Sequence, residues 1–362
     1  MKKRYIGIMS GTSLDGVDVA LCQVDTNECT LEYSYNISFN LELKKEILSV
    51  INATTTIKQI GELDHKLALV FAKAVNLLLN VAKLNASDIV AIGSHGQTLW
   101  HEPHGEHPFS LQLGNASVLA VETGIEVISD FRSKDVALGG QGAPFAPAFH
   151  QFLFSNINSC AVLNLGGMAN ISILGKELIG YDTGCGNVLM DLWIKEHQNL
   201  EYDKEGAWAK SGKVHHILLN KMLEDEYFLL NFPKSTGREY FNKKFLIKYL
   251  EALGKIEAKD VQATLLALTV HSVANEIKKF NIKELLVCGG GVRNIFLMNA
   301  LQRALPSVQV APTEKYGVDS ENMEAMIFAW LAHKRLQEEK VDLKTVTGAR
   351  KNTILGAIYA SS

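Results

Sequence analysis

Near its N-terminus the chain carries Gly7-Ile8-Met9-Ser10-Gly11-Thr12-Ser13-Leu14-Asp15-Gly16-Val17-Asp18. Three glycines and three hydroxyl residues interrupt an apolar run, and two carboxylates follow. Glycines let backbone N–H groups crowd around an anion, and hydroxyl groups add donors. Carboxylates hold a hydrated metal ion. The stretch therefore predicts a loop that binds nucleotide phosphates.

The residues after this loop predict a strand. Val17, Val19 and Leu21 alternate with less apolar residues, which is the period of a half-buried strand. The loop is then a strand–turn–strand, whereas a Walker or Rossmann loop leads into a helix. Taken alone, such a stretch is more typical of an ordinary glycine-rich hairpin. Two further glycine clusters downstream favour the phosphate loop.

Length and composition predict a globular protein with two domains. The chain has 362 residues, 47% of them hydrophobic and 21% charged. Lys and Arg number 36 against 39 Asp and Glu, which gives a net charge of −3. This balance gives no sign of a nucleic-acid or anionic-membrane partner.

No targeting segment is expected. Met1-Lys2-Lys3-Arg4 is basic, but Ser10 and Gly11 break the apolar run that a signal peptide needs. No apolar run looks long enough to span a membrane. The five cysteines are scattered without a C-x-x-C pair, which indicates reduced thiols and a cytoplasmic location.

The first half reads as a three-strand meander over 4–10, 17–24 and 30–38, followed by helices over 43–52 and 60–85. A strand over 89–93 leads into Ser94–Thr98, a helical or buried stretch lies near 115–122, and another strand covers 125–129. The run from 137 to 144 is the most glycine-dense in the chain, and we expect a domain junction close to it.

The pattern then restarts. Residues 161–174 again read as strand, glycine turn and strand, and a third strand ends at 181–187. Helices are expected over 187–198 and 260–281, and a buried strand over 285–288 precedes Gly289-Gly290-Gly291 and a helix. A last helix follows a cap at Asp319 or Ser320. We therefore predict an internal duplication into α/β domains 1–140 and 141–362, with a nucleotide in the cleft between them.

Several strings, in order along nearly the whole chain, resemble the anhydro-N-acetylmuramic acid kinase family of the actin, Hsp70 and sugar-kinase superfamily. They are GIMSGTSLDGVD (7–18), GSHGQTL (93–99), DFRSKDVALGGQGAPF (130–145), NLGGMANI (164–171), YDTGCGN (181–187), STGREYF (235–241), VCGGGVRN (287–294) and EAMIFAWL (324–331). One position departs from the pattern, because Cys185 stands where the family usually has proline.

The resemblance implies a two-domain actin-like ATPase fold, ribonuclease-H-like, with an interdomain nucleotide cleft. It implies an enzyme that uses ATP, Mg²⁺ and water to open the anhydro bridge of an amino sugar, 1,6-anhydro-N-acetylmuramic acid. The freed O6 is phosphorylated, and the products are N-acetylmuramic acid 6-phosphate and ADP in peptidoglycan recycling. A homodimer is expected on the same ground.

The resemblance also assigns roles to the glycine loops. The first phosphate loop comprises Gly11, Thr12, Ser13, Leu14, Asp15, Gly16, Val17 and Asp18, and the second comprises Asn164, Gly166 and Gly167. Asp15 or Asp18 would hold Mg²⁺ through water. The adenosine would lie against Gly289, Gly290, Gly291 and Asn294, and the alternative for these residues is a tight strand-to-helix turn.

Asp182 is the candidate base, because it ends a strand and precedes Thr-Gly. An Asp that caps the helix near 187 is the alternative. The expected sugar contacts are Gln97, Thr98, Arg132 and Glu324, with Arg132 suited to a lactyl carboxylate. By residue type alone, Arg132 is a surface arginine and Glu324 a surface carboxylate near a helix N-terminus.

Two other functions remain open on the sequence. One is a nucleotide-switch or filament protein of the actin and Hsp70 type, and the other is a plain sugar-hydroxyl kinase.

Overall fold

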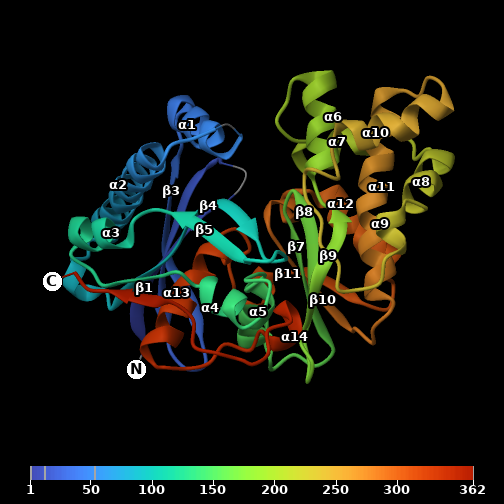
Figure 1. Cartoon of the computed structure of the whole chain (residues 1–362). Helices are drawn as coiled ribbons and strands as arrows, with labels where there is room; N and C mark the ends of the chain where they lie inside the picture. The colour runs from blue at the N-terminus through green and yellow to red at the C-terminus, as the bar shows by residue number, and fades with distance from the viewer. Residues whose placement is uncertain (1, 12–13, 53, 362) are drawn as a thin grey trace. The chain divides into compact units, whose positions relative to one another are not determined.

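The computed structural model describes residues 2–11, 14–52 and 54–361, and it separates into two compact units. Unit 1 comprises Met1–Leu153 and Asn322–Ser362, and unit 2 comprises Phe154–Glu321. Each unit is described by itself below, and Figure 1 labels most of the helices and strands.

Unit 1 contains a mixed seven-stranded sheet among the described residues, in the order β12-β6-β4-β1-β2-β3 with β5 paired to β4. Its strands are β1 (Lys3–Ser10), β2 (Gly16–Val24), β3 (Cys29–Ser38), β4 (Ala91–Glu102), β5 (Phe109–Leu113), β6 (Val127–Ser129) and β12 (Ala357–Tyr359). Its helices are α1 (Leu41–Asn52), α2 (Ile57–Ala82), α3 (Ala116–Thr123), α4 (Ser133–Ala137), α13 (Met323–Leu336) and α14 (Lys344–Thr347). Helix α5 (Ala146–Phe154) ends at the boundary with unit 2.

Unit 2 contains a five-stranded sheet in the described chain, in the order β11-β10-β7-β8-β9. Its strands are β7 (Cys160–Leu165), β8 (Met168–Ile173), β9 (Ile179–Cys185), β10 (Glu284–Cys288) and β11 (Gln309–Pro312). Its helices are α6 (Val188–Gln198), α7 (Ala207–Ser211), α8 (His216–Leu223), α9 (Glu226–Leu229), α10 (Lys243–Leu250), α11 (Ala258–Ile277) and α12 (Ile295–Ala304).

The two sheets share one topology. In unit 1, β1, β2 and β3 form an antiparallel meander, and β4 and β6 then add in parallel beside β1. In unit 2, β7, β8 and β9 form the meander, and β10 and β11 add in parallel beside β7. This repeat confirms the predicted duplication and the α/β, actin-like ATPase fold class.

The compact units differ from the predicted division into 1–140 and 141–362. The glycine-dense run lies inside unit 1, where the buried Asp135 carboxylate accepts hydrogen bonds from Gly142 N (2.8 Å) and Thr347 Oγ1 (2.9 Å). The last 41 residues, Asn322–Ser362, return to unit 1, where α13 packs against β1, β2 and β4. Helix α13 begins at Met323 after Asn322, so the predicted cap at Asp319 or Ser320 is wrong.

Helices α2 and α13 cover opposite faces of the sheet in unit 1. Side chains alternate between the two faces of a strand. Ile6 and Ile8 of β1 lie in the apolar core that also contains Leu67 and Phe71 of α2. Between them, Gly7 faces α13, and a Cβ built at Gly7 would lie 1.8 Å from the carbonyl oxygen of Ala325. Glycine at this position therefore lets the helix backbone touch the sheet.

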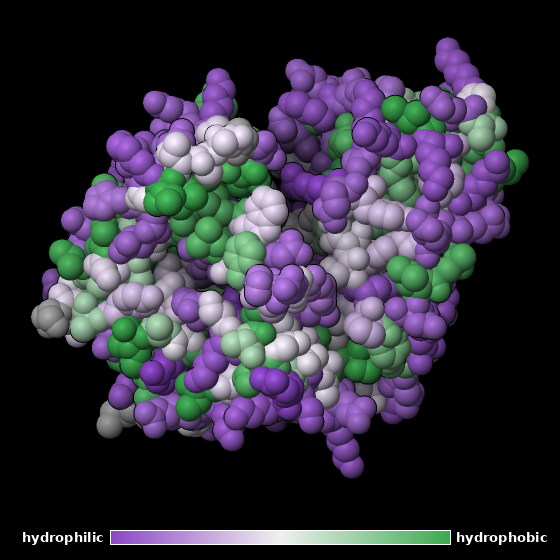
Figure 2. Space-filling view, in the orientation of Figure 1, coloured by the Kyte–Doolittle hydropathy of each residue, from purple (hydrophilic) through white to green (hydrophobic). Residues whose placement is uncertain are grey.

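By length and composition alone, helix α2 could cross a membrane. Among the described residues it is the one helix that meets this criterion. The expectation that no apolar run is long enough was therefore wrong. The core helix of a globular protein passes the same test, and Leu63, Leu67 and Leu78 of α2 are fully buried in the core of unit 1. Hydrophilic residues predominate on the face in Figure 2, with hydrophobic residues scattered among them.

The contact between β1 and α13 gives a stability prediction. We expect Gly7→Ala to lower the free energy of unfolding by about 1–3 kcal/mol, because the added methyl group overlaps helix backbone that cannot rotate away. Gly61→Ala is the matched control. Gly61 lies in α2 with nothing within 4 Å of its Cβ position, so this change should stabilise by about 0.5–1 kcal/mol. Thermal unfolding of both variants checks this, and equal melting temperatures would contradict the close packing.

Candidate active site

In unit 1, the first glycine loop joins β1 to β2. Leu14 N donates to Gly11 O at 3.2 Å, and Leu14 is buried with a left-handed φ of 59°. Thr12 and Ser13 lie outside the described residues. A Cβ at Gly16 would lie 2.2 Å from Ile37 O on β3, so glycine is required there to pair the strands, whatever the loop binds.

The two candidate metal ligands differ in their surroundings. Asp15 is exposed, and Asp18 on β2 accepts a hydrogen bond from Asn36 Nδ2 at 2.7 Å. Surrounding protein atoms and the nearby Asp18 carboxylate raise the pKa of Glu324 on α13. The side chain of Glu324 still reaches solvent. No group of three or more metal-binding side chains occurs in the described residues. Mg²⁺ usually keeps several waters and binds through one or two carboxylates, and Asp15 and Asp18 would supply two.

Gln97, Thr98 and Arg132, three of the expected sugar residues, each have partners within the fold of unit 1, and Gln97 Nε2 donates to Thr98 O at 3.3 Å. Gln97 on β4 is buried, and its Oε1 lies 2.7 Å from Ser10 Oγ at the start of the first loop. Thr98 Oγ1 accepts from Gln112 Nε2 at 3.3 Å. Arg132 Nε donates to His95 Nε2 at 3.0 Å, and its guanidinium lies 5.8 Å from the centre of the Phe145 ring. The structure thus places Gln97 beside the first loop and ties Arg132 to β4.

His95 was not singled out from the sequence, although it lies within GSHGQTL. Its Nδ1 lies 2.8 Å from Gly96 O and must donate, so Nε2 is free to accept from Arg132. Burial and the Arg132 charge lower the pKa of His95 to about 3, which keeps the ring neutral. Burial also lowers the pKa of Arg132 to about 10. His95 therefore orients a guanidinium that is still positive at neutral pH.

In unit 2, the start of α6 fixes the second glycine loop. Gly186 N and Val188 N donate to Gly167 O, and Asn187 N donates to Gly166 O, at 2.9–3.1 Å. A Cβ at Gly186 would lie 2.4 Å from Gly166 O, so this approach requires glycine. Arg238, also not singled out, is the nearest group to the Cβ position of Gly167, at 3.8 Å.

Asp182 lies on β9, and its carboxylate is fixed through one oxygen. Thr236 N and Ser235 Oγ donate to Oδ2 at 2.9 and 3.2 Å. Tyr227 Oη donates to the Asp182 carbonyl oxygen at 2.9 Å. Asn187, and not Asp182, occupies the cap position of α6, so the capping alternative does not describe this carboxylate.

The pKa of Asp182 is raised. Burial is the largest cause, the hydrogen bonds from Thr236 and Ser235 oppose it, and the charge of Glu239 adds to it. The carboxylate is thus partly desolvated yet held by two donors, which is the environment of a positioned general base.

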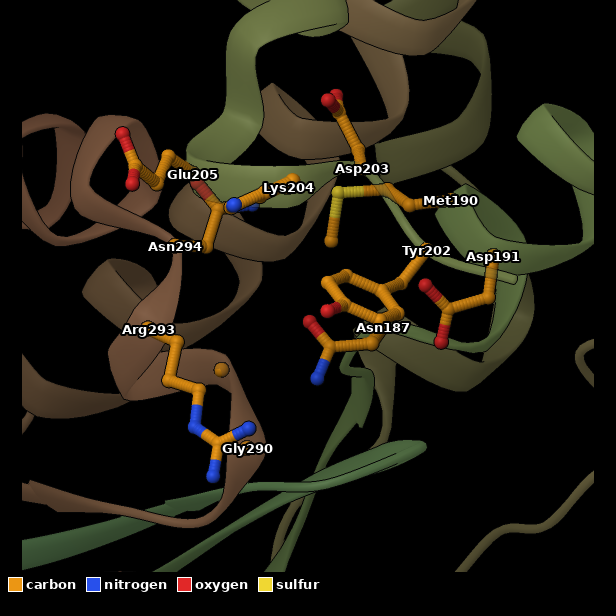
Figure 3. Close-up of a pocket in the computed structure, with 11 residues that line it drawn as sticks. Asn187, Met190, Asp191, Tyr202, Asp203, Lys204, Glu205, Gly290, Arg293 and Asn294 are labelled. Carbon is orange, nitrogen blue, oxygen red and sulfur yellow. The ribbon is translucent and has the colours of Figure 1, made fainter. Parts of the chain in front are cut away.

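A pocket of about 510 Å³ lies within unit 2 (Figure 3). Gly290, Gly291 and Asn294, three of the four residues expected around adenosine, line it, while Gly289 does not. Its other lining residues were not predicted from the sequence and are Asn187, Met190, Asp191, Tyr202, Asp203, Lys204, Glu205 and Arg293. The lining thus combines one aromatic ring and one thioether with five charged side chains, which could recognise a polar small molecule.

The three glycines of this turn have different roles. A Cβ at Gly289, where φ is 84°, would lie 2.4 Å from Asn164 Oδ1, and one at Gly291 would lie 2.6 Å from Leu165 Cβ. Both are needed to pack the turn on β7. A Cβ at Gly290 would have nothing within 4 Å, so this glycine leaves open space in the pocket. Asn294 caps α12 by accepting from Leu297 N at 2.9 Å.

Asp191 on α6 has the most perturbed carboxylate of the pocket lining. Burial raises its pKa to about 7, the Arg238 charge opposes the shift, and Asp203 and Glu201 add to it. Asp203, in contrast, is used by the fold, since it accepts from Trp208 N and Ala209 N at 2.9 Å.

Comparison with known proteins identifies the family. A family model described as anhydro-N-acetylmuramic acid kinase matches residues 3–361. A curated protein of that name from Sulfurovum sp. (strain NBC37-1) is 57% identical over 99% of both chains. Those from Sulfurimonas denitrificans and Aliivibrio fischeri are 53% and 48% identical over 99% of this chain and 100% of theirs. These matches do not favour a nucleotide switch or a plain sugar-hydroxyl kinase, and the chain belongs to the anhydro-N-acetylmuramic acid kinase family.

Proposed function

We propose that this protein is an ATP-dependent kinase that hydrolyses the 1,6-anhydro bond of 1,6-anhydro-N-acetylmuramic acid and phosphorylates O6. The products are N-acetylmuramic acid 6-phosphate and ADP, as in peptidoglycan recycling. Family membership over the whole chain supports the reaction. The observation that carries the mechanism is the Asp182 carboxylate, which two donors fix through Oδ2.

Asp182 is the proposed base. Both hydrogen bonds to its carboxylate reach Oδ2, so among the described residues Oδ1 is the oxygen left to accept a proton from water. The water oxygen attacks the anomeric carbon, the bond from that carbon to the bridging oxygen breaks, and Oδ1 takes the proton. The released oxygen becomes O6 and accepts the γ-phosphoryl group. One carboxylate thus serves hydrolysis and transfer together.

For the sugar, we propose that Arg132 binds the lactyl carboxylate and that Gln97, Thr98 and Glu324 contact the ring. The His95 contact holds the Arg132 guanidinium in one orientation, which favours two-point recognition of a carboxylate.

For the nucleotide, we propose that the adenosine occupies the pocket at Gly290, Gly291 and Asn294, with Tyr202 as a stacking surface. The phosphates would contact the first loop, from Gly11 to Asp18, and the second loop at Asn164, Gly166 and Gly167. Arg238 Nη2 lies 3.8 Å from the Cβ position of Gly167 in the second loop. Mg²⁺ would be held through water by Asp15 and Asp18 and would supply charge neutralisation at the phosphates.

A cellular location and an oligomeric state are also proposed. We infer a cytoplasmic location, which the five buried cysteines, scattered without a C-x-x-C pair, support. We infer a homodimer from the family resemblance, and light scattering after size-exclusion chromatography tests it.

The central test is the product. Wild-type protein with ATP and the anhydro sugar in ¹⁸O-labelled water should give a product labelled at the anomeric hydroxyl, read promptly by mass spectrometry. Asp182→Asn keeps the shape but removes the basic oxygen, so ring opening and phosphorylation should both fall about 10²- to 10⁴-fold. ATP binding to this variant serves as the control and should survive. Label in the phosphate, or near-normal turnover by the variant, would contradict the mechanism.

The pocket is tested at Gly290. We expect Gly290→Val to fold normally and to weaken ATP binding at least tenfold, since its side chain would enter open space in the pocket. Gly291→Val is the contrasting variant and should lower the melting temperature, because its Cβ would overlap Leu165. Calorimetric titration with a non-hydrolysable ATP analogue measures binding. Unchanged affinity in a folded Gly290→Val protein would place the nucleotide elsewhere.

Asp191 gives a pH prediction for stability. Its pKa is about 7 in the fold against about 3.9 in an unfolded chain, so its ionisation destabilises the fold increasingly as the pH rises from 4 to 7. Asp191→Asn should therefore stabilise the protein by on the order of 1–2 kcal/mol at pH 8, after allowance for partial exposure, and hardly at all at pH 4. Melting curves at both pH values measure it, and an equal gain at both would contradict the raised pKa.

A further inference from the structure

Unit 2 contains a buried ion pair that hydrogen bonds connect to the strand carrying Asp182. Lys234 Nζ is 2.8 Å from Glu276 Oε1, and the two side chains are only 2% and 4% exposed. Glu276 is near the end of α11, and its Oε2 accepts from Tyr181 Oη at 2.9 Å and pairs with Lys279 Nζ at 2.6 Å. Tyr181 directly precedes Asp182 on β9. The pair therefore joins a core helix to the strand that carries the proposed base.

The segment from Lys234 to Thr236 has no helix or strand of its own. Lys234 O accepts from Asp182 N at 3.1 Å, and the next two residues supply both donors to Asp182 Oδ2. Lys234 Nζ also lies 5.2 Å from the ring centre of Tyr227, whose hydroxyl donates to the Asp182 carbonyl. The position of both carboxylate donors thus depends on where the Lys234 side chain is anchored.

The free energy of burying charges indicates that this ion pair fixes the position of the residues that carry it. Burying two charges costs about as much desolvation as their attraction returns, and apolar residues of the same size would stabilise a core at least as well. An ion pair differs in fixing one geometry, since the ammonium and the carboxylate must meet at hydrogen-bond distance. Burial acts to raise the pKa of Glu276, but the bonds from Lys234 and Lys279 outweigh it, so this pKa is lowered and the ionised carboxylate is favoured.

We propose that Lys234 and Glu276 are positioning residues for the general base: their buried ion pair holds Ser235 and Thr236 at the Asp182 carboxylate and thereby sets its orientation and its basicity. This inference rests on the proposed role of Asp182.

The expected pH effect follows from the groups that face Asp182. Ser235 and Thr236 donate to its ionised form, Tyr227 bonds its carbonyl, and the charge of Glu239 opposes ionisation. If the two donors move away, the ionised form loses stabilisation while the opposing charge remains. The pKa then rises, and because the base acts ionised, the acid limb of kcat moves to higher pH.

The test compares two lysines that bind the same carboxylate. Lys234→Met breaks the buried pair, whereas Lys279→Met removes the outer lysine, which is 40% exposed and binds the other oxygen of Glu276. The double variant Lys234→Met/Glu276→Gln leaves no unpaired buried charge and keeps an acceptor for Tyr181. Each protein is measured for thermal unfolding, kcat, KM for ATP and the pH profile of kcat.

We expect the double variant to remain folded, with kcat at least tenfold lower, the acid limb at higher pH and KM for ATP within twofold of wild type. Lys279→Met should stay within twofold in every measurement. A double variant with wild-type kcat and an unmoved acid limb would overturn the inference. The inference would also be overturned if kcat fell and KM for ATP rose by the same factor while the acid limb did not move. Failure of the double variant to fold would overturn it too, because either result assigns the ion pair to stability alone.

Asp182→Asn in the same assays separates this inference from the function it rests on. If Asp182→Asn keeps normal turnover, the proposed base is wrong whatever Lys234 does. If Asp182→Asn is inactive while the double variant behaves as wild type, only the positioning role fails.

Discussion

The close approach of α13 to β1 and β4 is the constraint on which unit 1 depends. A Cβ at Gly7 would lie 1.8 Å from Ala325 O, and one at Gly93 would lie 1.9 Å from Phe328 O. Only glycine at both strand positions lets helix backbone contact the sheet directly. Since α13 follows unit 2 in sequence, this contact also makes unit 1 discontinuous along the chain. The same two glycines therefore determine both the packing and the domain boundary.

The candidate site of unit 1 is built on that contact. With α13 at this distance, Glu324 lies near enough to Asp18 for the two charges to interact, and the Phe328 ring lies 4.9 Å from the His95 ring. Phe328 helps to bury His95, burial keeps the imidazole neutral, and the neutral ring accepts from Arg132. The guanidinium proposed to bind the sugar carboxylate is thus oriented, through one histidine, by the packing of a helix on a sheet.

The sequence predicted what depends on local pattern. The two strand meanders, the duplication and the glycine turns follow from period-two alternation broken by glycine, and the structure has them. The short helices α7 to α10 were not predicted, because helices of four to eight residues carry little periodicity. The predicted domain boundary lay at a glycine-rich run, which is a local signal. The contact that decides the boundary joins residues more than 300 positions apart, so no local pattern indicates it.

For the candidate site, the sequence predicted which residues to consider, but it did not predict which residues form hydrogen bonds or packing contacts with them. Asp182 was named from YDTGCGN, but its donors come from a segment more than 50 residues later that has no regular structure. Gly16, Gly289 and Gly291 were assigned to ligand binding, and each also has a neighbour in the fold that excludes a side chain. Asp191 and Tyr202 lie outside the motifs and meet only when the pocket forms.

Asp182 and Asp191 show how one unit gives two carboxylates different properties. Burial raises the pKa of both. At Asp182, an N–H and a hydroxyl bond one oxygen, which favours the ionised form and fixes the direction of the other oxygen. At Asp191, the opposing influence is the more diffuse charge of Arg238, and the pKa stays near 7. The proposed base therefore has donors at fixed positions, and the irregular segment that supplies them carries one member of a buried ion pair. Asp191, which lines the pocket, lies on a regular helix instead.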